Sequence, residues 1–343
     1  MNKKLGYMAL IAMALAAPFV LYPVFLMKIL CFALFACAFN LLIGFTGLLS
    51  FGHAAFFGGA GYVAGYVLKN WGWPFEIGLL AGVAFSAAIG LLMGSLAIRR
   101  QGIYFTMITL ALAQMLFFVF LQAPFTGGED GLQAIPRGSL FGTISLADDL
   151  TLYYVVLAIA LGGFALIVRT VHSPFGQVLK AVKENQARAV SLGYDVDRYK
   201  LLAFVLSAAL SGLAGATKSV VLGFETLTDV HWTLSGLVVL MTLVGGLGTL
   251  TGPIVGALVI IILENKLGEI GNWVAAITGV EWFQTIGESV TIVTGFIFII
   301  CVLAFRRGIV GELAPIFASR SARMRSNGEK EERPNLASAI RHT

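Results

Sequence analysis

The polar stretch TVHSPFGQVLKAVKENQARAVSLGYDVDRYK, residues 170–200, interrupts a chain that is otherwise dominated by apolar segments. Ser173 followed by Pro174 is typical of a helix start, because serine can cap free backbone N–H groups and proline fits the first helical position. Asn185 can cap a second short helix, and Gly193 supplies the left-handed residue that ends it. Apolar residues recur at helical spacing in the first helix. The stretch therefore predicts two short helices outside a membrane, which either form a docking surface or lie at the lipid headgroups.

The composition of the chain places it in a membrane. Of its 343 residues, 58% are hydrophobic and only 12% are charged, far from the balance of a soluble domain. Many apolar runs can cross a hydrocarbon layer of about 30 Å, which requires roughly 20 helical residues. Because the alternating strands of membrane barrels are absent, we predict an all-α polytopic membrane protein with about ten transmembrane helices. The expected spans are residues 5–22, 26–43, 53–68, 77–98, 103–121, 152–169, 201–222, 234–245, 252–264 and 285–305.

The charges between the spans predict the orientation. Loops rich in lysine and arginine stay on the cytoplasmic side, which places 170–200 inside. The loop 122–150 carries four acidic residues against one arginine, as expected outside. The net charge of +5 therefore indicates orientation and gives no sign of nucleic-acid binding. We expect both termini in the cytoplasm, a transmembrane domain over residues 1–307 and a disordered basic tail over residues 308–343.

Two glycine-rich segments interrupt the apolar runs: GFTGLLSFG at residues 44–52 and GGLGTLTGP at residues 245–253. A break at the second one returns the basic C-terminus to the cytoplasm and leaves either two short spans or a re-entrant segment. The two segments match at several aligned positions, which indicates either a duplication of the kind seen in transporters or chance.

Irregular backbone at membrane depth must be surrounded by protein or a water-filled cavity. Both breaks are therefore candidates for a translocation path, with helix packing as the alternative explanation. The path candidates are Gly44, Thr46, Gly47, Ser50, His53, Gly245, Gly248 and Thr249.

The sequence predicts neither a catalytic nor a metal centre. The four histidines are scattered and the three cysteines follow no metal spacing. The segment GLAGATKS at residues 212–219 approaches a phosphate-binding loop but has a threonine in place of the second glycine and lies in an apolar run. We expect its Lys218 to snorkel from the outer end of a span. Acidic residues are missing from the middle of the predicted spans, which argues against a carrier driven by protons or sodium.

Several motifs together resemble the branched-chain amino-acid permease family of ABC importers, in particular its LivM-type subunit. The resemblance extends over residues 25–310 and leaves the basic tail without a counterpart. The motifs are NLL at 40–42 with Gly44 and Gly47, GHA at 52–54, QGIYF at 101–105, SPFGQ at 173–177, AVKEN at 181–185, GYDV at 193–196 and the second glycine break.

The resemblance implies an ABC-importer permease fold with cytoplasmic coupling helices, embedded in the lipid of a bacterial inner membrane. It implies a transport subunit without enzymatic activity or a cofactor of its own. The expected partners are a homologous second permease, two cytoplasmic ATPase subunits that bind ATP and Mg²⁺, and a periplasmic amino-acid-binding protein. In that arrangement 170–200 rests in a groove of an ATPase. The expected coupling residues are Phe175, Val178, Lys180, Val182, Lys183, Glu184, Asn185, Arg188 and Gly193.

The outside loops would meet the loaded binding protein, with Glu129, Asp130, Glu225 and Asp229 as contact candidates. The implied cargo is a branched-chain amino acid, and urea, a short amide or a pentose are alternatives within the same class. An ion-coupled carrier and a membrane scaffold are alternatives of other classes. The carrier requires an intramembrane acid, and the scaffold has no need of a docking segment.

Overall fold

The computed structural model describes residues 14–19, 21–278, 295–296, 299 and 308–312. Most of the predicted spans 5–22 and 285–305 and of the predicted tail lies outside these residues. The division of the chain at residue 307 therefore stays a prediction.

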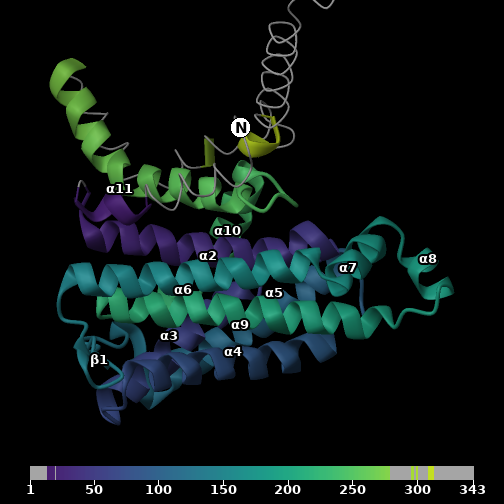
Figure 1. Ribbon diagram of the computed structural model, residues 1–343, viewed down its shortest axis with the longest axis horizontal. Coiled ribbons are helices and arrows are strands. Elements are labelled where there is room, and N and C mark those ends of the chain that lie inside the picture. The colour runs from purple at the N-terminus through teal and green to yellow at the C-terminus, as the bar shows by residue number, and fades with distance from the viewer. Residues whose placement is uncertain (1–13, 20, 279–294, 297–298, 300–307, 313–343) are drawn as a thin grey trace, which may run out of the picture.

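The described chain is a bundle of long helices, which confirms the predicted all-α class (Figure 1). The α-helices are α2 (Pro23–Thr46), α3 (His53–Asn70), α4 (Phe75–Ala97), α5 (Ile103–Gln122), α6 (Asp149–His172), α7 (Pro174–Glu184), α8 (Gln186–Ser191), α9 (Val196–Leu222), α10 (Trp232–Gly245) and α11 (Gly252–Thr278). The short elements are the 3-10 helices η1 (Ala17–Phe19), η2 (Pro124–Thr126), η3 (Gly128–Asp130) and η4 (Leu227–Asp229), and the antiparallel strands β1 (Ser139–Leu140) and β2 (Ile144–Ser145).

Five helices of the described chain are long and apolar enough to cross a membrane: α2, α4, α5, α6 and α9. The predicted span 53–68 corresponds to α3, which is rich in glycine and alanine and lies almost entirely buried. The predicted helix break at residues 245–253 is confirmed, because α10 ends at Gly245 and α11 begins at Gly252. The helix that contains the predicted span 252–264, α11, continues to Thr278.

Helix α9 lies at the centre of the bundle. It packs against α2, α3 and α4, and α2 packs in turn against α6, α10 and α11. In Figure 1, α7 and α8 project beyond one end of the bundle, and the β1–β2 hairpin lies at the opposite end. The chain therefore has an α7–α8 end and a β1–β2 end, joined directly by α9.

Small residues allow α9 and α4 to approach their neighbours closely. A side-chain carbon at Gly215 of α9 would lie 1.9 Å from the carbonyl oxygen of Phe57, and one at Gly90 of α4 would lie 2.6 Å from the β-carbon of Ala208. The hydroxyl of Ser86 donates a 2.8 Å hydrogen bond to the carbonyl oxygen of Phe56. Rows of small residues thus serve helix packing, where lipid supplies no hydrophobic drive for association.

Gly215→Ala tests this packing against Gly162→Ala, an exposed glycine within helix α6 that has nothing within 4 Å of an added β-carbon. We expect Gly215→Ala to destabilise the protein by about 1–3 kcal/mol, because the backbone of α3 must move. Gly162→Ala should be neutral or stabilising by up to about 1 kcal/mol, because alanine restricts the unfolded chain. Thermal unfolding of the detergent-purified variants measures both effects. Equal melting temperatures would contradict the close approach of α9 and α3.

Candidate functional site

The α7–α8 segment forms as its sequence predicts. The hydroxyl oxygen of Ser173 accepts a 3.4 Å hydrogen bond from the N–H of Gly176, and Pro174 occupies the first turn of α7. The amide oxygen of Asn185 accepts a 3.0 Å bond from the N–H of Arg188 and caps α8. Gly193 ends the segment with a φ of +87°, in the left-handed region that favours glycine.

The apolar face of α7 is covered by the segment itself. Val182 packs with Ala189 and Val196, and Val178 lies against this cluster. Val182 is 3% exposed, so the prediction that its side chain contacts a partner was wrong: the short helices fold onto the start of α9 and cover it. The ring of Phe175 is half-buried and stacks on Tyr199 with 5.6 Å between ring centroids.

A different set of apolar side chains is exposed on α8 and the turn after it. Val190 is 55% exposed, Leu192 is 68% exposed and Tyr194 is 41% exposed. The helical period of the sequence singled out none of them, because α8 is too short to show a period. Their alternation with smaller residues was the signal that could have found them. Glu184 and Arg188 are exposed beside this surface.

The two lysines of α7 point back toward the bundle. The ammonium of Lys183 donates a 2.7 Å hydrogen bond to the carbonyl oxygen of Gly44, at the end of α2. The ammonium of Lys180 lies 5.8 Å from the centroid of the Phe45 ring. Both contacts tie α7 to the first glycine break.

The two glycine breaks meet each other through Asn40 of α2, which is 2% exposed. The side-chain N–H of Asn40 donates a 2.8 Å bond to the carbonyl oxygen of Thr249, and its side-chain oxygen accepts a 3.0 Å bond from the N–H of Gly248. A β-carbon at Gly44 would lie 2.8 Å from the same Gly248 nitrogen. One asparagine therefore satisfies the backbone of the second break and holds it against the first.

The remaining path candidates are engaged locally. The hydroxyl of Thr249 accepts a 3.1 Å bond from the N–H of Gly252 and caps α11, and the hydroxyl of Thr46 bonds the carbonyl of Leu42 one turn earlier. The hydroxyl oxygen of Ser50 accepts a 3.1 Å bond from the N–H of Gly52.

Gly245 and His53 serve helix contacts. A β-carbon at Gly245 would lie 1.9 Å from the carbonyl oxygen of Gly252. His53 is fully buried, and its Nε2 donates to the hydroxyl of Ser207 at 2.9 Å, because that hydroxyl itself donates to a carbonyl of α2. Aromatic rings of α2, α3 and α9 surround the imidazole. These positions are packing positions of the chain.

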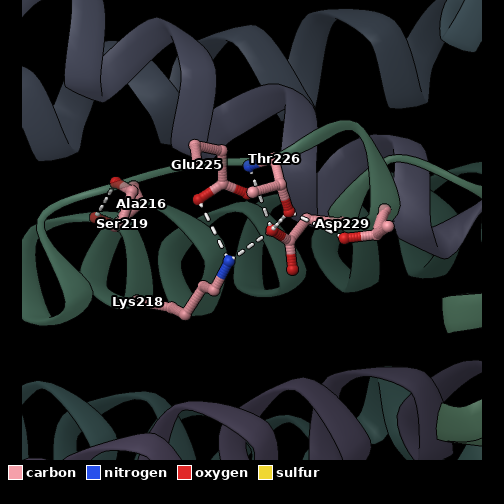
Figure 2. A network of polar contacts seen from close by, with 7 residues as sticks. Ala216, Lys218, Ser219, Glu225, Thr226 and Asp229 are labelled. Carbon is pink, nitrogen blue, oxygen red and sulfur yellow. Dashed lines mark hydrogen bonds and ion pairs between the residues drawn. The ribbon is translucent and has the colours of Figure 1, made fainter. Parts of the chain in front are cut away.

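A cluster of one lysine and two carboxylates lies at the other end of α9 (Figure 2). The ammonium of Lys218 is 2.5 Å from Asp229 Oδ2 and 3.3 Å from Glu225 Oε2. Asp229 Oδ2 also accepts bonds from the backbone and hydroxyl of Thr226, which caps η4. The glycines of α3 make room for the cluster: a β-carbon at Gly61 would lie 2.6 Å from the Glu225 carboxyl carbon.

Two predictions about this region were wrong. Lys218 does not snorkel to a surface, because its side chain is 4% exposed and paired with two carboxylates. Glu225 is fully buried and Asp229 is 9% exposed, so neither offers its carboxylate to a partner. Burial raises the pKa of the Glu225 carboxyl well above its usual range, although Lys218 beside it acts in the opposite direction.

The acidic residues that are exposed at this end are Glu129 and Asp130 of η3. Their loop is tied to the loop after α9 by a pair of backbone hydrogen bonds of 2.9 Å between Leu132 and Glu225. The buried cluster around Lys218 therefore holds in place the loop that carries the exposed Glu129 and Asp130. Within the described residues, no group of three or more histidine, cysteine, aspartate or glutamate side chains is placed to hold a metal ion.

The chain is similar to several bacterial and archaeal permeases. It is 26% identical over 300 residues, 79% of this chain and 70% of the relative, to the high-affinity branched-chain amino acid transport system permease protein LivM of Salmonella typhimurium. It is 32% identical over 197 residues to the autoinducer 2 import system permease protein LsrC of Klebsiella pneumoniae, covering 56% of this chain and 53% of that protein. It is 30% identical over 129 residues to a probable branched-chain amino acid transport permease protein, LivH of Methanocaldococcus jannaschii, covering 38% of this chain and 39% of that protein.

A family model covers most of the chain. It carries the description "Branched-chain amino acid transport system / permease component" and matches residues 24–303, which include every helix from α2 to α11 and both glycine breaks. With several apolar helices able to cross a membrane, the chain is a multi-pass membrane protein and belongs to this family of ABC-transporter permeases.

Proposed function

We propose that the chain is the membrane-spanning subunit of an ATP-driven, binding-protein-dependent importer of branched-chain amino acids in a bacterial inner membrane. The observation that carries the proposal is the α7–α8 segment, which projects from the bundle (Figure 1). Apolar side chains are exposed on α8 and the following turn. An exposed cluster of aliphatic and aromatic side chains marks a contact with another protein or with a membrane, and we propose a protein contact here.

The partners in this proposal are a homologous second permease, two cytoplasmic ATPase subunits and a periplasmic binding protein. The surface around Val190, Leu192 and Tyr194 fits a groove on an ATPase, with Arg188 and Glu184 at its edge. The ATPases hold ATP and Mg²⁺ and carry out its hydrolysis. In this proposal the α7–α8 end lies in the cytoplasm, together with both termini, and the basic residues of that end support this orientation.

Helix α9 supplies a mechanical route between the two ends. It begins directly after the docking surface, at Val196, and runs for 27 residues to Leu222. At 1.5 Å per residue the helix is about 40 Å long, and close contacts with α2, α3 and α4 stiffen it. A displacement of α7 and α8 on ATP binding moves α9 and thereby the loop after α9, whose Glu225 and Asp229 bind Lys218.

In this proposal, the β1–β2 end forms the surface that contacts the binding protein. Glu129 and Asp130 are its exposed acids, and the Lys218 cluster holds the neighbouring loop in place. Branched-chain amino acids are the favoured cargo because the similarity to LivM extends over 79% of this chain, whereas the similarity to LsrC covers 56%.

The docking surface is tested by Leu192→Asp and Val190→Asp. We expect at least a tenfold lower recovery of the ATPases with the purified permease, because each aliphatic side chain contributes about 1.5–3 kcal/mol when buried and 1.4 kcal/mol corresponds to a factor of ten. Phe141→Asp is the matched control, an exposed apolar residue (77%) at the opposite end of the bundle. Unchanged recovery with both α8-region variants would overturn the docking surface.

The cargo is tested by uptake into proteoliposomes that contain the complete importer and ATP, with purified binding protein outside. We expect ATP-dependent accumulation of radiolabelled leucine and no accumulation of urea or xylose. The same liposomes without ATP are the control for leakage. Accumulation of urea or xylose without leucine would contradict the proposed cargo and leave the docking surface untouched.

The Lys218 cluster is tested by Lys218→Met and Glu225→Gln. Lys218→Met should cost about 3–5 kcal/mol of stability, because it leaves two buried acidic side chains without their cationic partner. Lys69→Met is the matched control, an exposed lysine at the same end that donates to the carbonyl oxygen of Gln133. Equal thermal stability of Lys218→Met and Lys69→Met would contradict a stabilising role for the cluster.

The same cluster gives a pH dependence with a defined sign. Because folding raises the pKa of Glu225, the folded state holds a proton that the unfolded state releases above the ordinary glutamate pKa of about 4.3. The contribution of this carboxyl to stability is therefore present below that pH and is lost as the pH rises through the raised, folded-state pKa. Glu225→Gln should remove this component, and a melting-temperature profile as steep as that of the wild type would contradict it.

A further inference from the structure

We infer that Lys183 is the positioning residue through which a movement of the docking segment reaches the two glycine breaks. The inference rests on the proposed function and adds a specific link to it. It is based on the direction of the Lys183 side chain, which points away from the docking surface. Its ammonium donates a 2.7 Å hydrogen bond to the carbonyl oxygen of Gly44.

The bond has a physical reason at the end of α2. The last carbonyl groups of a helix have no partner within the helix, and they carry the negative end of its dipole. A lysine ammonium at this position supplies both a donor and a positive charge. Gly47, with a φ of +76°, ends α2 just beyond, and a β-carbon there would lie 3.3 Å from Lys183 Cγ. The lysine stem therefore lies along the glycine turn while its ammonium holds the helix end.

The same helix end carries the second break. Gly44 lies against Gly248, and Asn40, one turn earlier, bonds both Gly248 and Thr249. The hydroxyl of Thr249 in turn caps the start of α11. A continuous series of hydrogen bonds and close backbone contacts thus runs from α7 through the end of α2 to the start of α11.

The stem of Lys183 lies against the turn at Gly47, so a displacement of α7 larger than its rotamers can absorb either carries the end of α2 along or breaks the 2.7 Å bond to Gly44. Because Asn40 and Gly44 fix the second break to this helix end, both breaks move together. Lys183 accordingly transmits motion, whereas Val190 and Leu192 provide docking. Transmission and docking are thus assigned to different residues of the same short segment.

The experiment follows the second break directly and is independent of the cargo. Leu247, 40% exposed between α10 and α11, is replaced by cysteine in the complete importer in nanodiscs, and its maleimide labelling rate is measured with and without AMP-PNP and Mg²⁺. The parent without Leu247→Cys gives the background from the native cysteines. The test variants are Lys183→Met, which keeps the stem without the ammonium, and Lys183→Arg, which keeps a donor. Gln177→Ala, an exposed position on α7, is the control.

We expect AMP-PNP to change the labelling rate at least threefold in the Lys183 parent and in Gln177→Ala, and less than 1.5-fold in Lys183→Met, with ATPase recovery unchanged. Lys183→Arg should restore most of the change. A merely structural role would lower the melting temperature of Lys183→Met and leave the nucleotide response intact.

Three results would overturn the inference. The first is a full nucleotide response in Lys183→Met. The second is loss of the ATPases from Lys183→Met, which would place Lys183 in the docking surface. The third is a parent importer that binds its ATPases and shows no nucleotide response at residue 247. A parent chain that recovers no ATPase at all would overturn the proposed function instead, and the inference with it.

Discussion

The arrangement of this permease depends on how the backbone N–H and C=O groups at an interruption between helices find hydrogen-bond partners where no water is available. In hydrocarbon, each backbone N–H or C=O without a partner is costly, so irregular backbone survives only where other protein groups bond it. Asn40 meets this requirement for the second glycine break with one donor and one acceptor on a single side chain. The reversal between α10 and α11 can therefore lie against α2.

The rest of the bundle follows from close approach between helices. Glycines and serines on α4 and α9 bring backbones into contact with α3. This close approach lets α3 be buried although it is not among the described helices that are apolar enough to cross a membrane. Helix α9 thereby lies in the centre of the bundle, and a different structural feature is found at each of its ends. One end carries the α7–α8 segment on the chain just before it, and the other carries a lysine that two carboxylates hold in place.

The local structure of the α7–α8 segment was predictable because Ser173, Asn185 and Gly193 act on their immediate neighbours. The helix break near residue 245 was predictable from its glycines and from the charge balance of the loops. The partners of Lys218 and Lys183 were not predictable, because each lies on a different element or in a loop whose path depends on the fold. Apolar periodicity also misplaced the exposed face of the segment, since Val182 and Val178 cover the start of α9.

The two hydrogen bonds that the Asn40 side chain makes with the second glycine break have a consequence for the evolution of such chains. Aspartate at this position lacks the donor for Thr249, and leucine lacks both groups, so neither replacement preserves the two contacts. Either replacement leaves a backbone group of the turn, about two hundred positions later in the chain, without its partner. We therefore expect the two segments to vary together among descendants of this chain.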